Sequence, residues 1–313
     1  MRFAHLGFCS AAAALVACGG GTTTVSPAPH LLFHPLPGQS AEAITSAPKL
    51  RPSATHALLY VGGYRNNVVD VYDLSVHGYP LVETITDGVD GPGGLALDAQ
   101  NTLYVANNNN GTVTAYPFGS TSPSLTLHDR LSFATDVAVA RNGDVYVANR
   151  GSKPGIAVFK PGQNTVARYI TSQLIAKPES IFFHRDTLYI SDDNTGVSVR
   201  SRGGKIVSLG LQGLGAITSG LALDERNGAL YVGDNSNNVI HVFPKGSVTA
   251  AYSLPIVSPN FIVVAEIRHH TSIVSADFQS QNAYFFKPSN PNWYGVFQTA
   301  AEEANGVAFQ PAD

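Results

Sequence analysis

Cysteine is almost absent from this chain of 313 residues. The two cysteines, Cys9 and Cys18, both lie close to the N-terminus, so the sequence after residue 18 contains no pair that could form a disulfide. A chain of this length buries a large core and needs no such cross-links. We therefore expect its stability to come from the packing of its own elements.

Charged residues are also scarce, at 13% of the chain, and the formal net charge is −3. No cluster of Lys and Arg forms the basic patch of a nucleic-acid-binding protein, so we expect no nucleic acid partner. The sequence contains no His-Glu-x-x-His helix motif, no Gly-x-Ser-x-Gly elbow and no phosphate-binding loop. Beyond the N-terminal apolar stretch, no apolar segment is long enough to span a membrane.

A five-residue phrase recurs along the chain, with Leu or Val, then Tyr, then Val or Ile, a small residue, and Asn, Asp or Gly. The tyrosines of its five copies are Tyr60, Tyr104, Tyr146, Tyr189 and Tyr231. They are separated by 42 to 44 residues, and a degenerate sixth copy has Val274 in the place of the tyrosine. The chain is therefore an array of repeats.

The length of the repeat indicates the fold. Four short strands and their turns occupy about 40–50 residues, which is typical of one blade of a β-propeller. Six such periods account for the 257 residues from 57 to 313. The sequence predicts an all-β fold, a six-bladed β-propeller that fills residues 57–313.

The strands of one blade can be assigned directly. Residues 94–98 form a short apolar run that is typical of an innermost strand covered on both faces. Residues 102–107, 112–118 and 124–127 follow as three further strands, separated by polar turns.

The two ends of the array complement each other. No apolar run precedes Tyr60, whereas residues 305–309 form such a run with no tyrosine phrase after it. We expect this C-terminal strand to complete the first blade and to close the ring, which removes two exposed sheet edges.

The N-terminus indicates export. An apolar stretch over residues 6–16 follows Arg2 and is too short for a membrane-spanning helix, as in a secretory signal. Residues 15–19 resemble a bacterial lipoprotein cleavage box, which implies a signal peptide over 1–17 and lipidation of Cys18. Residues 18–56, rich in Pro, Gly and Thr, then predict a flexible tether. The expected location is the bacterial cell envelope, on the outer membrane and facing the periplasm or the surface.

Two polar positions recur with the repeat. The first lies three residues after each tyrosine position and is occupied by Gly63, Asn107, Asn149, Asp192, Asp234 and Asp277. Such a ring of oxygen atoms could bind a cation. We favour a structural role, because Asn and Asp at the start of a turn bond nearby backbone N–H groups.

The second position lies just before each innermost strand and is occupied by Gly93, Thr135, Glu179, Ser219, Asn260 and Asn305. Here the blades differ, as they must where a site is formed. The repeats resemble NHL and YncE-type propellers, and residues 220–224 and 305–311 resemble the SMP-30/gluconolactonase-like branch.

That second resemblance implies a divalent cation, such as Ca²⁺ or Zn²⁺, held by a Glu, an Asn and an Asp at this position. Glu179, Asn260 and Asn305 match it in part. No blade supplies the Asp, since Asp136 lies one residue later. A metal-dependent hydrolase with its site at the mouth of the central channel is therefore the alternative function.

The last blade contains the only tryptophan, next to a tyrosine, at Trp293 and Tyr294. This pair could form a recognition loop for a carbohydrate or a protein. It could also fill the space between blades six and one, in place of the tyrosine missing at 274.

The sequence thus favours a monomeric, lipid-anchored binding or scaffolding module without catalysis or a cofactor of its own. We expect its partner to be an envelope protein or a carbohydrate.

Overall fold

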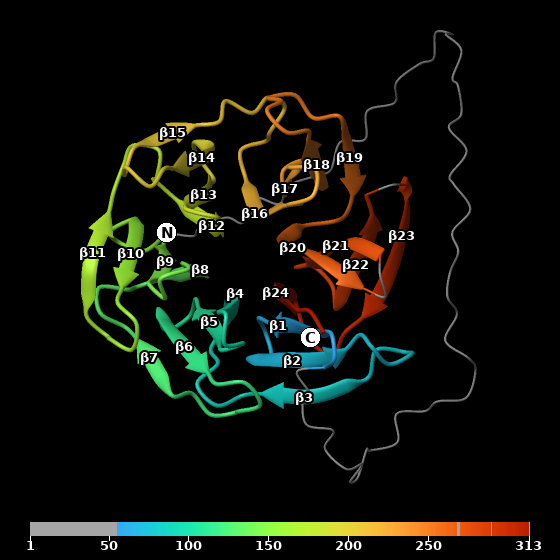
Figure 1. Cartoon of the computed structure of the whole chain (residues 1–313), viewed down its shortest axis with the longest axis horizontal. Helices are drawn as coiled ribbons and strands as arrows, with labels where there is room; N and C mark the ends of the chain where they lie inside the picture. Colours follow the sequence, from blue (N-terminus) through green and yellow to red (C-terminus); the bar gives the residue numbers. More distant parts are fainter. Residues whose placement is uncertain (1–54, 268–269, 289, 313) are drawn as a thin grey trace, which may run out of the picture. The chain divides into compact units, whose positions relative to one another are not determined.

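The computed structural model of the protein describes residues 55–267, 270–288 and 290–312, apart from the side chains of residues 291–294. Within these residues the chain forms 24 β-strands in six four-stranded antiparallel sheets. Figure 1 shows the sheets arranged as blades around a central axis. The predicted six-bladed β-propeller is therefore confirmed. In the described part of the chain, no helix has the length and apolar character that crossing a bilayer requires.

Each blade runs from an innermost strand outward. Blade one consists of β24 (Ala304–Gln310), β1 (Leu58–Gly63), β2 (Val68–Asp73) and β3 (Leu81–Ile85). Blade two consists of β4 (Pro92–Leu97), β5 (Leu103–Asn107), β6 (Thr112–Tyr116) and β7 (Leu125–Leu127). Blade three consists of β8 (Ala134–Val139), β9 (Val145–Asn149), β10 (Gly155–Phe159) and β11 (Val166–Ile170).

The other three blades repeat this order. Blade four consists of β12 (Pro178–His184), β13 (Thr187–Asp192), β14 (Gly196–Arg200) and β15 (Ile206–Ser208). Blade five consists of β16 (Thr218–Leu223), β17 (Leu230–Asp234), β18 (Val239–Phe243) and β19 (Tyr252–Pro255). Blade six consists of β20 (Pro259–Ile267), β21 (His270–Asp277), β22 (Asn282–Lys287) and β23 (Asn290–Gln298).

The C-terminal strand closes the ring. β24 pairs antiparallel with β1, with Leu59 opposite Phe309 and Val61 opposite Val307. The Tyr60 hydroxyl also donates to Oε1 of Gln310 over 3.2 Å. The first blade is thus built from both ends of the described chain, as the repeat pattern predicts.

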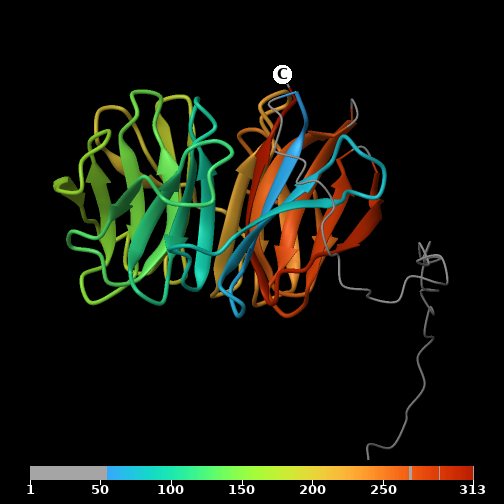
Figure 2. The same cartoon turned by 90° about the horizontal axis from the view of Figure 1, so that it is seen from below.

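The strands run between two faces of the ring, as Figure 2 shows from the side. We call the face where the innermost strands begin the entry face, and the face where they end the turn face. Gly143 and Gly228 lie in the turns after two innermost strands and have φ angles of 80° and 74°. The glycine of each of these Asn-Gly turns therefore has a left-handed conformation, which glycine adopts without strain.

Each innermost strand is irregular near its start. In blade four, for example, Pro178 pairs with Asp192, but the next paired residue is Ile181. The same shift occurs in β4, β8, β16, β20 and β24. Such bulges release one or two residues from their own sheet. These residues are the ones that differ between blades in the sequence.

Aromatic side chains fill the space between blades six and one. The ring centroids of Tyr72 and Phe297 are 4.9 Å apart, and Tyr79 stacks on Phe285 at 6.0 Å. These residues belong to a core cluster that also contains Val274. Trp293 and Tyr294 lie in β23, so this segment is a strand and not the predicted loop. The predicted roles of the two residues concern side chains outside the described residues.

Candidate functional site

The Asn and Asp side chains that follow the tyrosine phrases cap backbone groups. Asn149 Oδ1 accepts hydrogen bonds from the N–H groups of Ser132 (3.0 Å) and Phe133 (3.1 Å). Asp192 Oδ2 accepts from Ala176 (2.7 Å) and Lys177 (2.6 Å). In both blades the donors lie just before the innermost strand, so the side chain fastens the incoming loop to the blade. The predicted structural role is confirmed for these positions.

Blade one shows the same device with a different residue. Gly63 occupies the capping position, and a Cβ there would overlap the Asn66 side chain. Asn66 Oδ1 accepts from the Glu302 N–H over 3.1 Å, in the loop before β24. Asn66 thus replaces the missing Asn or Asp, which accounts for the exception in the repeat.

Several side chains at the bulges join neighbouring blades. Thr135 Oγ1 donates to the Pro178 carbonyl over 2.9 Å, and Asn305 Nδ2 donates to the Pro92 carbonyl over 2.9 Å. Ser219 Oγ makes the same kind of bond to the Pro259 carbonyl. At three bulges, therefore, the variable residue bonds the first residue of the next blade's innermost strand.

The three residues of the metal-dependent alternative are only partly brought together. Asn260 Nδ2 donates to Oδ1 of Asn305, so these two amides meet. Glu179 instead accepts from Arg150, and no hydrogen bond in the described part of the chain joins it to either amide. Among the described residues, no group of three His, Cys, Asp or Glu side chains could hold a metal ion. The alternative therefore stays a prediction that rests on the family resemblance.

Glu179 belongs to a charged network that sequence reasoning missed. Arg150 Nη1 lies 2.6 Å from Glu179 Oε2, and Arg150 Nη2 lies 2.5 Å from Asp193 Oδ2. One guanidinium of blade three thus holds two carboxylates of blade four. Burial raises the pKa of Glu179 to about 7, although the charge of Arg150 lowers it. The partners are 29 and 43 residues apart in sequence, and no local pattern marks them.

A cavity of about 230 Å³ is lined by innermost strands of several blades. Most of the residues that line it are apolar, and they include Ala96 and Ala138 of two innermost strands. Asp136 is its one acidic group. Both oxygens of Asp136 accept backbone N–H groups, those of Val137 and Ile181. This carboxyl group therefore links blades three and four.

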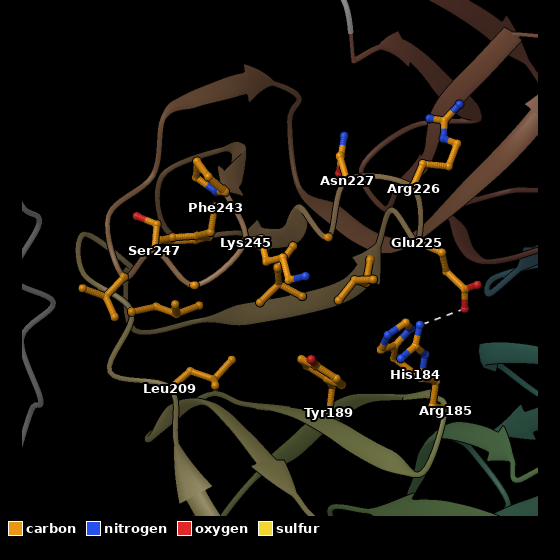
Figure 3. A pocket seen from close by; sticks show the side chains of 17 residues that line it. His184, Arg185, Tyr189, Leu209, Glu225, Arg226, Asn227, Phe243, Lys245 and Ser247 are labelled. Atoms are coloured by element: carbon orange, nitrogen blue, oxygen red, sulfur yellow. Dashed lines mark ion pairs between the residues drawn. The ribbon is translucent and has the colours of Figure 1, made fainter.

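A groove of about 510 Å³ lies between blades four and five, on the turn face (Figure 3). Leu209, Leu211 and Leu223 line it and are half-buried, whereas Phe243 is fully buried. Figure 3 shows Tyr189 entering from the side of blade four, with Lys245 opposite it. We call this cavity the blade 4–5 groove.

Polar groups surround the blade 4–5 groove. His184 Nδ1 of blade four lies 3.4 Å from Glu225 Oε1 of blade five, a pair that spans the two blades (Figure 3). Arg226 also lines the groove, but its guanidinium is bound to Asp224 and Glu266. An apolar floor with a few polar groups at its edge is the usual composition of a ligand-binding pocket.

Comparisons with known proteins identify the fold but no family. No family model matches the chain, and no curated protein matches it. A chain from the crystal structure of a nidogen/laminin complex superposes with a TM-score of 0.70 at 14% identity, covering 82% of this chain and 99% of that one. A chain of Kuenenia stuttgartiensis hydrazine synthase gives 0.55 at 13% identity, covering 78% and 81%. At such identities the likeness shows a shared propeller fold.

Proposed function

We propose that the protein is an exported, lipid-anchored binding module without catalysis of its own, and that its ligand binds in the blade 4–5 groove. The observation that carries this proposal is the groove itself, in which half-buried leucines lie open beside charged side chains. Apolar surface of this kind is stabilised when a ligand covers it.

The polar side chains at the two recurring positions of the repeat mostly make hydrogen bonds that stabilise the fold. The Asn and Asp side chains after the tyrosine phrases cap loops, and three of the bulge residues join blades. The nidogen/laminin chain supports the proposal in general terms, because that structure is of a complex between proteins.

Lipid anchoring is tested by separating the membrane fraction from the soluble fraction of cells that express the full chain. Cys18 and the cleavage box are the basis of this part of the proposal. We expect the wild type in the membrane fraction and Cys18→Ser in the soluble fraction. If Cys18→Ser remained in the membranes, lipidation of this residue would not be the anchor.

The groove is tested by photo-crosslinking in the native envelope. A crosslinking side chain replaces Val248, which lines the groove and is 42% exposed. The control replaces Val257, which is 47% exposed in the connection before β20, on the entry face. We expect a discrete product from position 248 alone, and its loss when Leu211→Glu places a charge on the floor. Identical products from both positions, or no effect of Leu211→Glu, would argue against the groove.

A further inference from the structure

The interface between blades four and five is less completely packed than the others. Its core cluster has five buried hydrophobic residues, whereas the other five clusters of the described chain have nine to fifteen each. Seven partly buried residues pack against those five, and in no other of these clusters do the partly buried residues outnumber the buried ones. Apolar surface therefore stays accessible here.

The accessible floor is aliphatic for the most part. Leu209, Leu211 and Leu223 lie around Leu230, which is 6% exposed. Sugars are usually recognised by flat aromatic side chains together with many hydrogen-bonding groups. A floor of leucines fits an alkyl chain better, because its contribution comes from apolar area removed from water.

The edge of the groove is positively charged. Three lining side chains are cationic and one, Glu225, is anionic, so the formal charge of the lining is +2, against −3 for the whole chain. The cations are Arg185, Arg226 and Lys245. Arg226 is held by two carboxylates, but neither Arg185 nor Lys245 forms an ion pair with any described residue. Two cations are therefore available to a ligand.

Local structure places both cations beside the groove. Arg185 has a φ of 54° in the two-residue turn between β12 and β13, a conformation in which glycine is favoured over arginine. The stem of Lys245 lies over Gly228, where an added Cβ would be 3.0 Å from the Lys245 Cδ. Figure 3 shows the Lys245 amine within the groove, whereas the Arg226 guanidinium points away from it.

We infer that the blade 4–5 groove binds a small amphipathic anion, with its alkyl chain on the leucine floor and its carboxylate at Lys245 and Arg185. This inference rests on the proposed function and names the ligand class. A volume of about 510 Å³ lies within the range of small-molecule sites, roughly 300–1,000 Å³. Charge-assisted hydrogen bonds from the two cations favour an anionic ligand over a neutral one, and burial of its alkyl chain contributes affinity.

The test measures how three probes of equal alkyl length bind to the full-length protein at physiological salt. The probes are octanoate, 1-octanol and octylammonium. Binding is measured by calorimetry and by NMR shifts of groove residues. We expect octanoate to bind about ten-fold more tightly than octanol, because one charge-assisted hydrogen bond contributes on this order. Octylammonium is expected to bind more weakly than octanol, and acetate, which lacks the chain, to leave the groove signals unchanged.

Two double variants locate the effect. Arg185→Gln with Lys245→Gln should reduce octanoate affinity about ten-fold and leave octanol affinity unchanged. The control combines Arg141→Gln, in the corresponding turn of blade three, with Lys205→Gln; neither residue lines the groove. This control should bind octanoate like the wild type. Melting temperatures show that both variants are folded.

The outcomes separate the inference from the proposed function. If octanol or octylammonium binds the groove as tightly as octanoate, or both double variants lose the same affinity, the groove binds ligands but the anion assignment is wrong. If an acidic peptide, titrated in the same way as a further probe, occupies the groove and octanoate does not, the ligand is a protein segment and the small-anion assignment is again wrong. If none of the probes shifts the groove signals, the groove is not the binding surface.

Discussion

Asp136 has the most unusual environment of the acidic residues. It is 3% exposed and lines the cavity between the innermost strands. Burial raises its pKa to about 8, and the negative charge of Glu179 also raises it. The hydrogen bonds from Ile181 and Val137 oppose this shift without cancelling it. Asp136 thus holds a proton at pH values where an exposed aspartate is ionised.

This protonation makes stability depend on pH. The ordinary pKa of the Asp136 carboxyl is 3.8, so between pH 4 and 8 the folded state binds more protons than the unfolded state. The free energy of unfolding therefore falls as pH rises through this window. We expect the melting temperature of the wild type to fall between pH 5 and 8, and that of Asp136→Asn to fall less. A residual slope is expected from Glu179, whose raised pKa of about 7 has the same sign. Parallel curves for the two proteins would contradict this prediction.

Local sequence predicts some residue roles and not others. The capping role of Asp192 follows from its position at the start of a turn, where its Oδ1 accepts hydrogen bonds from the Asn194 and Thr195 N–H groups. The pairing of Glu179 with Arg150 joins two blades, so it depends on how the sheets are placed and not on any spacing in the chain.

The innermost strands are the elements on which the ring depends. Each of them packs against the innermost strands of its neighbours, so the backbones of adjacent blades approach closely. At Gly220 in β16, an added Cβ would overlap the Asn260 carbonyl oxygen and lie 2.7 Å from the Phe261 Cα in β20. Glycine is therefore required here by the next blade and not by its own strand.

Gly220→Ala should consequently destabilise the propeller. The neighbouring backbone cannot rotate away as a flexible side chain could, so blades five and six must separate. We expect a loss of about 1–3 kcal/mol in the free energy of unfolding, measured by chemical denaturation. The control is Gly203→Ala in the turn before β15, where the nearest atom to a new Cβ is 3.9 Å away. Equal stability of Gly220→Ala and Gly203→Ala would show that the close approach is unimportant.

At the scale of the whole molecule, closure decides whether the fold is stable. β24 covers the inner edge of β1, and its removal would expose the unpaired N–H and C=O groups of that strand. It would also remove Ala304 and Val307 from the core between blades six and one.

Deletion of residues 304–313 is therefore expected to unfold or aggregate the protein. Size-exclusion chromatography and thermal melting provide the measurement. Deletion of residues 311–313 alone keeps all of β24 and serves as the control, for which we expect a melting temperature close to that of the full chain. A 304–313 deletion that stays monomeric and melts like the wild type would refute the role of closure.

The sequence by itself determined the number of blades, the strands within them and the closure of the ring. These features repeat every 42 to 44 residues, and a repeated pattern of short apolar strands and polar turns can be read without knowing any distant contact. Gly63 and Val274 were visible in the sequence as departures from the pattern. The sequence did not show that Asn66 replaces the capping residue missing at 63, or that aromatic residues of neighbouring blades pack near Val274.

Only the tertiary structure decided which polar residues are left for binding. The groove between blades four and five combines residues from separate repeats, and its openness results from incomplete packing between two sheets. Packing across a blade interface depends on the shapes of both partners at once. No single repeat carries that information, so the groove and its two unpaired cations appear only when the blades are assembled.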